Sequence, residues 1–451
     1  TRSLGLPVFS PLDSEGYYTE EAGEKLKGKS VLEVDPEIIE MLEDKDLLFY
    51  SERFEHEYPH CWRCKTELIY RAADQWFIEN EEVKQRMLEE NEDVDWMPDD
   101  KEKRFHDFVS QSPDWCISRQ NYWGIPIPVW VCDDCGEYQV IGSFDELEEK
   151  AGGLPEDFDP HKHVVDEISW NCECGGEFER IPDIFDVWFD SGIAPFASMH
   201  YPFEEQPFEE MWPMDFITEA SDQIRGWFYS LMFTGILGFD EAPYEKILYQ
   251  GYVLRSDGEK MSKSAGTTIS PQDQLEKFGA DLPRFYQLRL APPWEQKNYD
   301  EDEIRNEIYR LFSVYWNTKE FLKTHLTDVE KPDDLQIEDE WILSRVNSVN
   351  AGAAEKMDDC HFHELARDIE DFVVEDLSRW YVKKVRERIK NGDEAAIWTL
   401  EKVLMRITKL MAPFSPFISE RIYQDLDGEL ESVHMEGYPE ADEKRLDEGL
   451  E

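Results

Sequence analysis

Residues 249–266, YQGYVLRSDGEKMSKSAG, are the most informative segment for the fold and function, because their polar second half contains two lysines. Apolar residues on either side of Gly251 predict strands, and Ser256-Asp257-Gly258 is typical of a turn. Ser270 and Pro271 then predict a helix start, with serine at the cap and proline in the first turn. Residues 256–266 are called the lysine loop below.

Two flexible cations on a loop beyond a strand suit a polyphosphate, because negative charge grows on the leaving oxygens during transfer. For a generic lysine pair, a solvated basic loop would be the better interpretation. The pentapeptide KMSKS at 260–264 is expected by chance in only about one chain in several thousand at average residue usage. We therefore predict a phosphate-binding loop.

The composition predicts a folded chain of two or three domains with ample core, since it has 451 residues of which 41% are hydrophobic. Its 102 acidic and 47 basic residues give a net charge of −55. Such a charge repels nucleic acid, whereas high salt would screen it. We favour a salt-loving cytoplasm over a protein that avoids nucleic acid, although charge alone does not separate the two.

The ends and the apolar runs of the chain predict a soluble, cytoplasmic protein with no membrane partner. No secretory leader is visible, and the longest apolar run, 227–239, is too short to cross a bilayer. The chain lacks Met at position 1 and begins in mid-pattern, so we expect a fragment of a longer protein.

Six of the eight cysteines form three close pairs, which favours metal ligation in a reducing compartment over disulfides. Cys132 and Cys135 form a C-x2-C pair, and Cys172 and Cys174 form a C-x-C pair after 36 intervening residues. Four thiolates in two pairs suit a closed structural zinc site, and the adjacent glycines let backbone amides approach sulfur. Unligated core cysteines are the alternative.

Cys61 and Cys64 form the third pair, again with C-x2-C spacing. One such pair supplies half of a tetrahedral zinc site. A redox pair or two buried thiols are the alternatives. Partner ligands for this half site are not obvious in the chain.

Polar side chains follow a predicted strand at 213–220, which has Phe216 and Ile217 at its centre and which we expect to be buried and parallel. The strand leads directly into a helix, with Ser221 or Asp222 as the expected cap. In doubly wound sheets, ligands bind at the carboxyl ends of strands and against such helix starts.

Glu219, Asp222 and Gln223 are therefore well placed to bind a ribose and an amino group, and a plain helix cap without ligand is the alternative. Trp188, in the run DIFDVWFD at 183–190, is a candidate pocket wall, although most tryptophans in such runs belong to the core.

From residue 300 onward, apolar stripes at helical spacing predict an antiparallel bundle whose last stripe is broken at Pro413 and Pro416. One short segment of this bundle carries five cations with only Glu387 against them. They are Lys383, Lys384, Arg386, Arg388 and Lys390. In so acidic a chain we predict phosphate contacts there, and a solvated helix end is the alternative.

Taken together, the segments 114–130, 186–192, 219–227 and 260–264 occur in the order found in isoleucyl-tRNA synthetases, which are class I aminoacyl-tRNA synthetases. DQIRGWF at 222–228 and NYWGIPIP at 121–128 are similar to the isoleucyl forms, where valyl and leucyl relatives differ. The resemblance covers nearly the whole chain.

The resemblance implies an α/β plus all-α architecture: the second half of a Rossmann-type catalytic domain with a zinc-binding insertion, then an antiparallel anticodon-binding bundle. The implied parts are the close of the editing insertion with half a zinc knuckle (1–75), the return into the catalytic domain (76–130), the zinc-binding insertion (131–180), the second catalytic half with its KMSKS loop (181–292) and the helical anticodon-binding domain (293–451).

The resemblance also implies roles for individual residues and the ligands they would bind. Both cysteine clusters resemble zinc modules of the family, and the partners would be tRNA-Ile, isoleucine, and ATP with Mg²⁺. The implied side chains are Glu219, Asp222 and Gln223 for the aminoacyl-adenylate, Trp188 and Trp227 beside the isoleucine side chain, Lys260, Ser262 and Lys263 for ATP, with both lysines catalytic, and Lys383, Lys384, Arg386 and Arg388 for tRNA.

Some of the family pattern is missing. None of the ten histidines lies in a His-x-Gly-His sequence, the other class I signature. The first half of the nucleotide-binding fold and most of the editing insertion would lie before Thr1, so we expect this chain to be inactive alone. The alternatives are a portion of a valyl-tRNA synthetase and a non-catalytic, zinc-containing tRNA-binding module.

Overall fold

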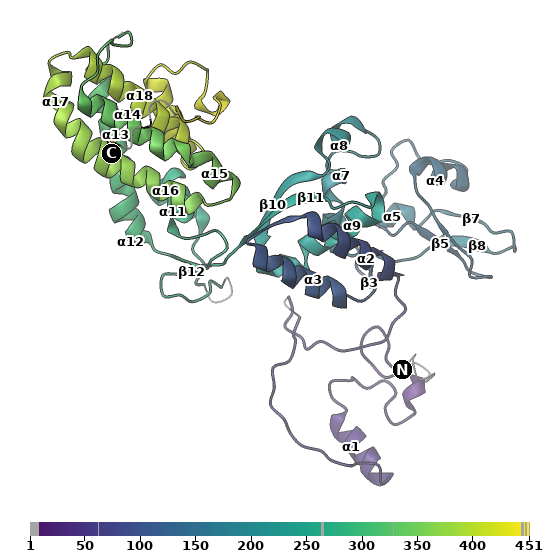
Figure 1. The fold of residues 1–451 in the computed structure, drawn as a ribbon. Helices are drawn as coiled ribbons and strands as arrows, with labels where there is room; N and C mark the ends of the chain where they lie inside the picture. Colours follow the sequence, from purple (N-terminus) through teal and green to yellow (C-terminus); the bar gives the residue numbers. More distant parts are fainter. Residues whose placement is uncertain are drawn as a thin grey trace. The chain divides into compact units, whose positions relative to one another are not determined.

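The computed structural model describes residues 9–61, 63–262, 266–327, 329–442, 446 and 449–450. The chain forms two compact units, residues 1–78 with 115–185, and residues 79–114 with 186–451 (Figure 1). None of the described helices is both long and apolar enough to cross a membrane.

The first unit contains a small antiparallel sheet in the order β6-β5-β8-β7. Its helix α1 begins at Asp35, with Pro36 in the first turn. The strands are β1 (Phe77–Ile78), β3 (Trp115–Cys116), β4 (Ser118–Arg119), β5 (Val129–Cys132), β6 (Tyr138–Val140), β7 (Ser169–Asn171), β8 (Glu177–Arg180) and β9 (Ile184–Phe185), and the helices are α1 (Asp35–Asp44), α4 (Phe144–Ala151) and α5 (Lys162–Val165).

The second unit contains a three-stranded parallel sheet in the order β10-β11-β2. Its strands are β2 (Asp95–Met97), β10 (Met214–Ala220), β11 (Tyr244–Gln250), β12 (Val253–Arg255) and β13 (Lys297–Tyr299). The helices beside them are α2 (Glu81–Glu90), α3 (Glu102–Gln111), α6 (Val187–Gly192), α7 (Ala194–Ala197), α8 (Gln206–Met211), α9 (Trp227–Phe239) and α10 (Pro271–Phe278).

The predicted parallel strand at 213–220 is confirmed as β10, but it is not buried along its length. Ile217 is 8% exposed, whereas Phe216 is 44% exposed. In the described sheet β10 has a neighbour, β11, on one side only, so its side chains are only partly covered. The apolar pattern therefore found the strand correctly and overstated its burial.

The predicted helix start after the lysine loop is also confirmed. Ser270 is the N-cap of α10, and its Oγ accepts a hydrogen bond from the Asp273 amide at 3.3 Å. Pro271 occupies the first helical position, where a missing amide hydrogen costs nothing.

The C-terminal part of the second unit is helical, as the apolar stripes predict. Its elements are α11 (Asp281–Leu290), α12 (Glu301–Glu303), π-helical Ile304–Ile308, α13 (Tyr309–Lys323), α14 (Ile337–Ala351), α15 (Ala353–Asp358), α16 (Phe362–Asp371), π-helical Phe372–Val382, α17 (Lys383–Lys390), α18 (Glu394–Met411) and α19 (Pro416–Asp425). One buried apolar cluster runs from Phe285 to Leu426. Because Phe285 and Tyr286 of α11 belong to it, the helical core crosses the expected border at residue 292.

A buried carboxylate ties two helices of this bundle together. Asp281, at the start of α11, is 7% exposed and accepts hydrogen bonds from the amides of Phe417 at 3.3 Å and Ile418 at 2.6 Å. Those amides open α19, whose own cap residue Ser415 provides no side-chain bond. Asp281 thus caps a helix more than 130 residues further along the chain.

We expect Asp281→Ala to lower the free energy of unfolding by about 1–3 kcal/mol, because two amides lose their charged acceptor. Urea unfolding followed by far-UV circular dichroism measures this change. Asp281→Asn keeps an acceptor oxygen and should lose less, and Asp273→Ala, at an exposed position of α10, is the control. Equal loss in Asp281→Ala and Asp273→Ala would contradict the capping role.

Candidate functional site

The carboxyl ends of β10 and β11 lie side by side, which places the predicted acidic residues at one edge of the sheet. Glu219 pairs in register with Tyr249, and Ala220 with Gln250. Glu219 and Asp222 are both exposed at this edge. The strand end therefore presents two carboxylates to solvent next to the segment that leads into β12.

Tyr252 connects this strand end to the lysine loop. Its hydroxyl accepts a hydrogen bond from Ser221 Oγ at 3.0 Å and donates one to Asp222 Oδ1 at 3.3 Å. The ammonium of Lys260 lies 4.9 Å from the centroid of the same ring, within cation–π range. Tyr252 therefore contacts both Asp222 and the first lysine of the pentapeptide, while Lys263 lies outside the described residues.

The start of α9 differs from the prediction, because neither Ser221 nor Asp222 caps it. Ser221–Arg225 form a 3-10 turn, and the α-helix begins only at Trp227. The cap comes from Gln223, whose Oε1 accepts a hydrogen bond from the Trp227 amide at 2.8 Å. Its Nε2 donates to Asp222 Oδ2 at 2.9 Å, so Gln223 also orients the neighbouring carboxylate.

Trp188 lies close to Gly226, the residue that precedes Trp227. A Cβ atom at Gly226 would lie 2.9 Å from Trp188 Cη2 and 2.6 Å from Gln223 Oε1, so a larger residue would have to displace these side chains. Trp227 Nε1 donates to the backbone oxygen of Ser191 in α6 at 3.0 Å. Trp188 is 40% exposed, and Gln223, which also lies close to Gly226, is hydrogen-bonded to both Asp222 and Trp227.

Sequence reasoning missed Tyr252 and Gly226. The strand pattern could have shown that Tyr252 lies in the short connection between β11 and β12, near the end of the sheet. No pattern in the sequence marks the close approach of Trp188 to Gly226, because those residues are 38 positions apart.

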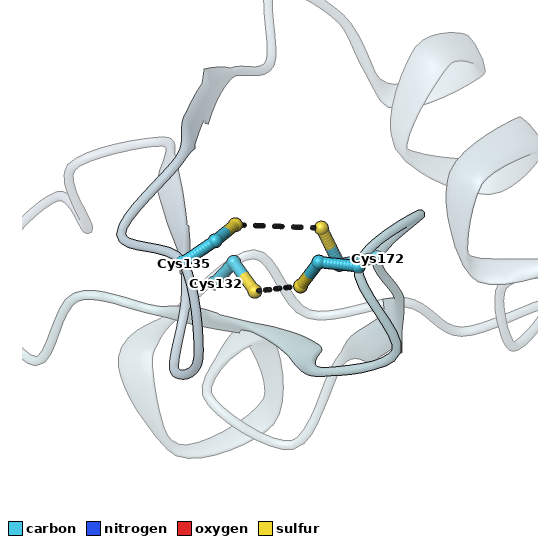
Figure 2. A group of neighbouring side chains, drawn as sticks. Cys132, Cys135 and Cys172 are labelled. Atoms are coloured by element: carbon cyan, nitrogen blue, oxygen red, sulfur yellow. Dashed lines mark hydrogen bonds between the residues drawn. The ribbon is translucent and has the colours of Figure 1, made fainter.

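Four cysteines of the first unit, Cys132, Cys135, Cys172 and Cys174, bring their sulfurs together (Figure 2). Cys132 Sγ lies 3.4 Å from Cys174 Sγ, Cys135 Sγ lies 3.8 Å from Cys172 Sγ, and all four sulfurs lie within 4.8 Å of one another. All four thiols are free of disulfides. For a tetrahedral zinc with Zn–S bonds of about 2.3 Å, the sulfurs would be about 3.8 Å apart. The donor set and its spacing therefore fit a closed tetrahedral metal site.

The local backbone prepares these sulfurs to bind a cation. The backbone amide of Cys135 is the main cause that lowers the pKa of the Cys132 thiol to about 7. The Cys174 amide also favours the thiolate of Cys172, but burial and the neighbouring thiols outweigh it and raise that pKa to about 12. Four thiols packed this closely do not all ionise without a cation among them.

Gly176 is required beside this cluster. A Cβ atom there would lie 2.9 Å from Cys132 Sγ and 2.7 Å from Asp133 Oδ1. The Gly176 amide donates to Cys174 Sγ at 3.5 Å, as the knuckle-like sequence predicts.

Cys61 and Cys64 form a tight turn but are in no group of three or more candidate ligands within the described residues. The Cys61 amide donates to the Thr66 oxygen at 2.8 Å, which closes the turn. The Thr66 side chain is the main cause that lowers the pKa of Cys64 to about 7. The metal-binding role of this pair remains a prediction.

The cationic segment forms α17, and its side chains divide into two groups. Lys383, Lys384 and Arg386 are exposed, and the Arg386 guanidinium lies 5.7 Å from the ring centroid of Phe321. Lys390 is also exposed and pairs with Glu387 at 2.7 Å. The exposed group remains accessible to a phosphate backbone.

Arg388 differs from its neighbours because it points into the bundle. It forms ion pairs with Asp339 at 2.7 Å, Asp393 at 2.9 Å and Glu338 at 3.0 Å. Asp339 is fully buried and also accepts a hydrogen bond from Tyr381 OH at 2.7 Å. Removing Arg388 would leave the buried Asp339 carboxylate without its cation. We therefore do not assign Arg388 to tRNA binding.

The comparisons with known proteins agree with this architecture. A family model described as "tRNA synthetases class I (I, L, M and V)" matches residues 15–300, and one described as "Anticodon-binding domain of tRNA ligase" matches residues 339–451. The chain belongs to the class I tRNA synthetases.

Within this family the chain is similar to archaeal proteins named isoleucine–tRNA ligase. It is 46% identical to the one from Archaeoglobus fulgidus and 44% identical to the one from Methanothrix thermoacetophila. Each match covers 99% of this chain and 44% of the relative. The chain thus spans less than half the length of these relatives.

Two solved structures share the fold. A LeuRS–tRNA–LeuAMS ternary complex of Agrobacterium radiobacter K84 matches 74% of this chain and 43% of its own, with a TM-score of 0.57 and 24% identity. Mycobacterium tuberculosis methionyl-tRNA synthetase with methionyl-adenylate matches 81% of this chain and 65% of its own, with a TM-score of 0.59 and 17% identity.

Gly226→Ala should lower the free energy of unfolding of the second unit by about 1–3 kcal/mol, because the new methyl group overpacks against Trp188 and Gln223. Urea unfolding followed by tryptophan fluorescence checks this. The control is Gly238→Ala, near the end of α9, where no atom lies within 4 Å of the added Cβ. This substitution should leave the free energy of unfolding unchanged or raise it slightly. If both variants have the same free energy of unfolding as the unsubstituted chain, Trp188 and Gln223 do not pack closely against Gly226.

Proposed function

We propose that this chain supplies the lysine loop, the adenylate-binding strand end and the helical tRNA-binding part of an isoleucine–tRNA ligase. The parent reaction would join isoleucine to ATP, release pyrophosphate and transfer the aminoacyl group to tRNA-Ile. The observation that carries this proposal is the cluster in which Tyr252 contacts both Asp222 and Lys260.

The charges of this cluster suit an adenylation reaction. Lys260 and Lys263, with Ser262, would bind the phosphates of ATP, which arrives with Mg²⁺ as substrate. Cations placed where charge develops on the leaving pyrophosphate stabilise the transition state. Glu219 and Asp222 at the opposite side would bind the amino group and the ribose of the adenylate.

The two tryptophans suit the side chain of the amino acid. Trp188 and Trp227 present large apolar surfaces near Gly226 and Gln223, and Gln223 contacts Asp222, one of the carboxylates that would bind the adenylate. An apolar side chain of isoleucine size would bury its methyl groups against these rings. Gln223 would hold Trp227 and Asp222 in a fixed relation, because it is hydrogen-bonded to both.

The reaction needs groups that this sequence does not contain. The family's His-x-Gly-His signature is absent, so we propose that the chain alone is inactive and acts as part of a complete ligase. A non-catalytic tRNA-binding module is the alternative of another class. The adenylate-type cluster and the relatives' names favour the ligase, and isoleucine rather than valine.

Two further sites would support the reaction without taking part in its chemistry. Lys383, Lys384 and Arg386 on α17 would contact tRNA phosphates. We propose zinc for Cys132, Cys135, Cys172 and Cys174, where it would cross-link β5 to the turn between β7 and β8. The half site at Cys61 and Cys64 would need ligands from elsewhere.

The test is isoleucine-dependent exchange of pyrophosphate into ATP by a complete ligase, built by replacing the matching segment of the Archaeoglobus fulgidus relative with this chain. Isoleucine should support exchange at lower concentration than valine. Lys263→Ala should slow the exchange more than about tenfold, because the lost charge is worth a few kcal/mol in the transition state. Lys277→Ala, which removes a surface ion pair with Glu301, is the control. An unchanged rate in Lys263→Ala would contradict the phosphate role.

Metal analysis tests the cysteine site in the chain by itself. We expect one tightly bound zinc, lost in Cys132→Ser and in Cys172→Ser but retained in Cys116→Ser, because only the first two remove a ligand. Chelation should also lower the thermal midpoint of the first unit. A folded and reduced sample without zinc would show the assignment to be wrong.

A further inference from the structure

A cavity of about 310 Å³ in the second unit is lined by two arginines that the site described above does not use. Arg104, Phe108 and Gln111 reach it from one face of α3, because residues three or four positions apart lie together on a helix. Arg225 reaches it from the last position of the 3-10 turn Ser221–Arg225. We call this space the arginine cavity.

Both arginines of this cavity keep their charge available. In the described part of the chain, neither Arg104 nor Arg225 forms an ion pair or a hydrogen bond, and both side chains are exposed. The guanidinium carbon of Arg225 lies 5.9 Å from the ring centroid of Phe108. Asp107 also lines the cavity, and its carboxylate lies 3.9 Å from His106. In a chain with 102 acidic and 47 basic residues, two such arginines beside one carboxylate indicate an anion site.

The wall between these arginines and α9 is rigid. Asn80 is 1% exposed, and its Nδ2 lies 2.7 Å from Ser112 Oγ, 3.1 Å from the Pro113 oxygen and 3.2 Å from the Ser112 oxygen. Phe108 packs against Tyr229 of α9 with ring centroids 5.1 Å apart. A wall that is already ordered lowers the entropic cost of binding, while exposed guanidinium groups can still turn toward a ligand.

We propose that the arginine cavity binds a phosphodiester in the single-stranded end of tRNA that accepts the amino acid, and this inference rests on the function proposed above. A guanidinium matches two phosphate oxygens, and unpaired bases stack on aromatic rings beside cationic grooves. Arg225 follows Asp222 by three positions of a 3-10 turn, a rise of about 6 Å. The cavity therefore lies near the strand end that would hold the adenylate, which the reacting end of tRNA must reach.

Aminoacylation of tRNA-Ile by the complete ligase measures this contact. Arg104→Gln and Arg225→Gln should each raise the KM for tRNA about tenfold, the effect of one lost hydrogen bond to a charged group. Isoleucine-dependent pyrophosphate exchange needs no tRNA, so its KM values for ATP and pyrophosphate should stay within twofold. Because the two arginines belong to different elements, a folding defect in one variant leaves the other informative.

Matched variants test the sign and the position of the charge. Asp107→Asn removes the carboxylate from the lining and should lower the KM for tRNA. Lys103→Gln removes the same charge as Arg104→Gln from an exposed position of the same helix outside the lining, and should change this KM less than twofold. Each arginine substitution should also reduce the slope of log affinity against log salt concentration by about 0.7, the value for one phosphate contact to a single strand.

A shortened tRNA locates the contact along the nucleic acid. A tRNA-Ile transcript without its single-stranded end should inhibit aminoacylation with the same inhibition constant in the unsubstituted ligase and in both arginine variants. The complete transcript should bind about tenfold more weakly to both variants.

The outcomes separate the possible failures. An unchanged KM for tRNA in both arginine variants overturns the site, and equal weakening of complete and shortened tRNA overturns its assignment to the acceptor end. A changed KM for pyrophosphate with an unchanged KM for tRNA places an inorganic anion in the cavity and overturns the RNA assignment. If the unsubstituted ligase shows no isoleucine-dependent exchange, the proposed function itself falls, and this inference falls with it.

Discussion

The site depends on one aromatic residue that holds a cation and a carboxylate together without neutralising either. Tyr252 donates its hydroxyl to Asp222 and offers its ring face to Lys260. An acidic residue at this position would form an ion pair with Lys260 and consume the charge that a phosphate needs. A cation–π contact at an exposed site is worth only about 0.5–1 kcal/mol, so the ammonium can turn toward a stronger anion at small cost. Within the described residues, Lys260 has no ion pair.

Keeping the charge of Lys260 available for a phosphate matters in a chain with 102 acidic and 47 basic residues. Many cations are held in ion pairs that serve the fold. Arg388 is bound by three carboxylates, and fully buried Lys319 is held by Asp425 at 2.7 Å and by the ring of Trp316. A cation that stays exposed among so many carboxylates is therefore informative, and Lys383 and Lys384 on α17 are such cations.

The sequence predicted the features that depend on neighbouring residues and missed those that depend on distant ones. The strand at 214–220, the cap at Ser270 and the helical stripes follow from local periodicity and turn chemistry, and each is present. The cysteine spacing likewise anticipated the four-sulfur cluster. The expected cap at Ser221 or Asp222 was wrong, because Ser221–Arg225 form a 3-10 turn and the α-helix starts only at Trp227, whose amide is bound by Gln223. Likewise, only the folded bundle reveals that Asp339 is the partner of Arg388.

The position of the lysine loop follows from a contact between backbones at Gly251. A Cβ atom there would lie 2.0 Å from the Glu295 oxygen, so no other residue fits without moving one of the two segments. The Gly251 amide donates to the Pro293 oxygen at 2.9 Å, and the Lys297 amide donates to the Tyr252 oxygen at 3.0 Å. The chain on both sides of Tyr252 is thus joined to residues 293–297, which lead from α11 of the helical core into β13. Because Tyr252 is fixed to that segment, a shift of the segment would move the ring that holds Lys260 near Asp222. The same connection therefore joins Tyr252 to the segment that follows α11, whose Phe285 and Tyr286 pack in the buried core of the helical bundle.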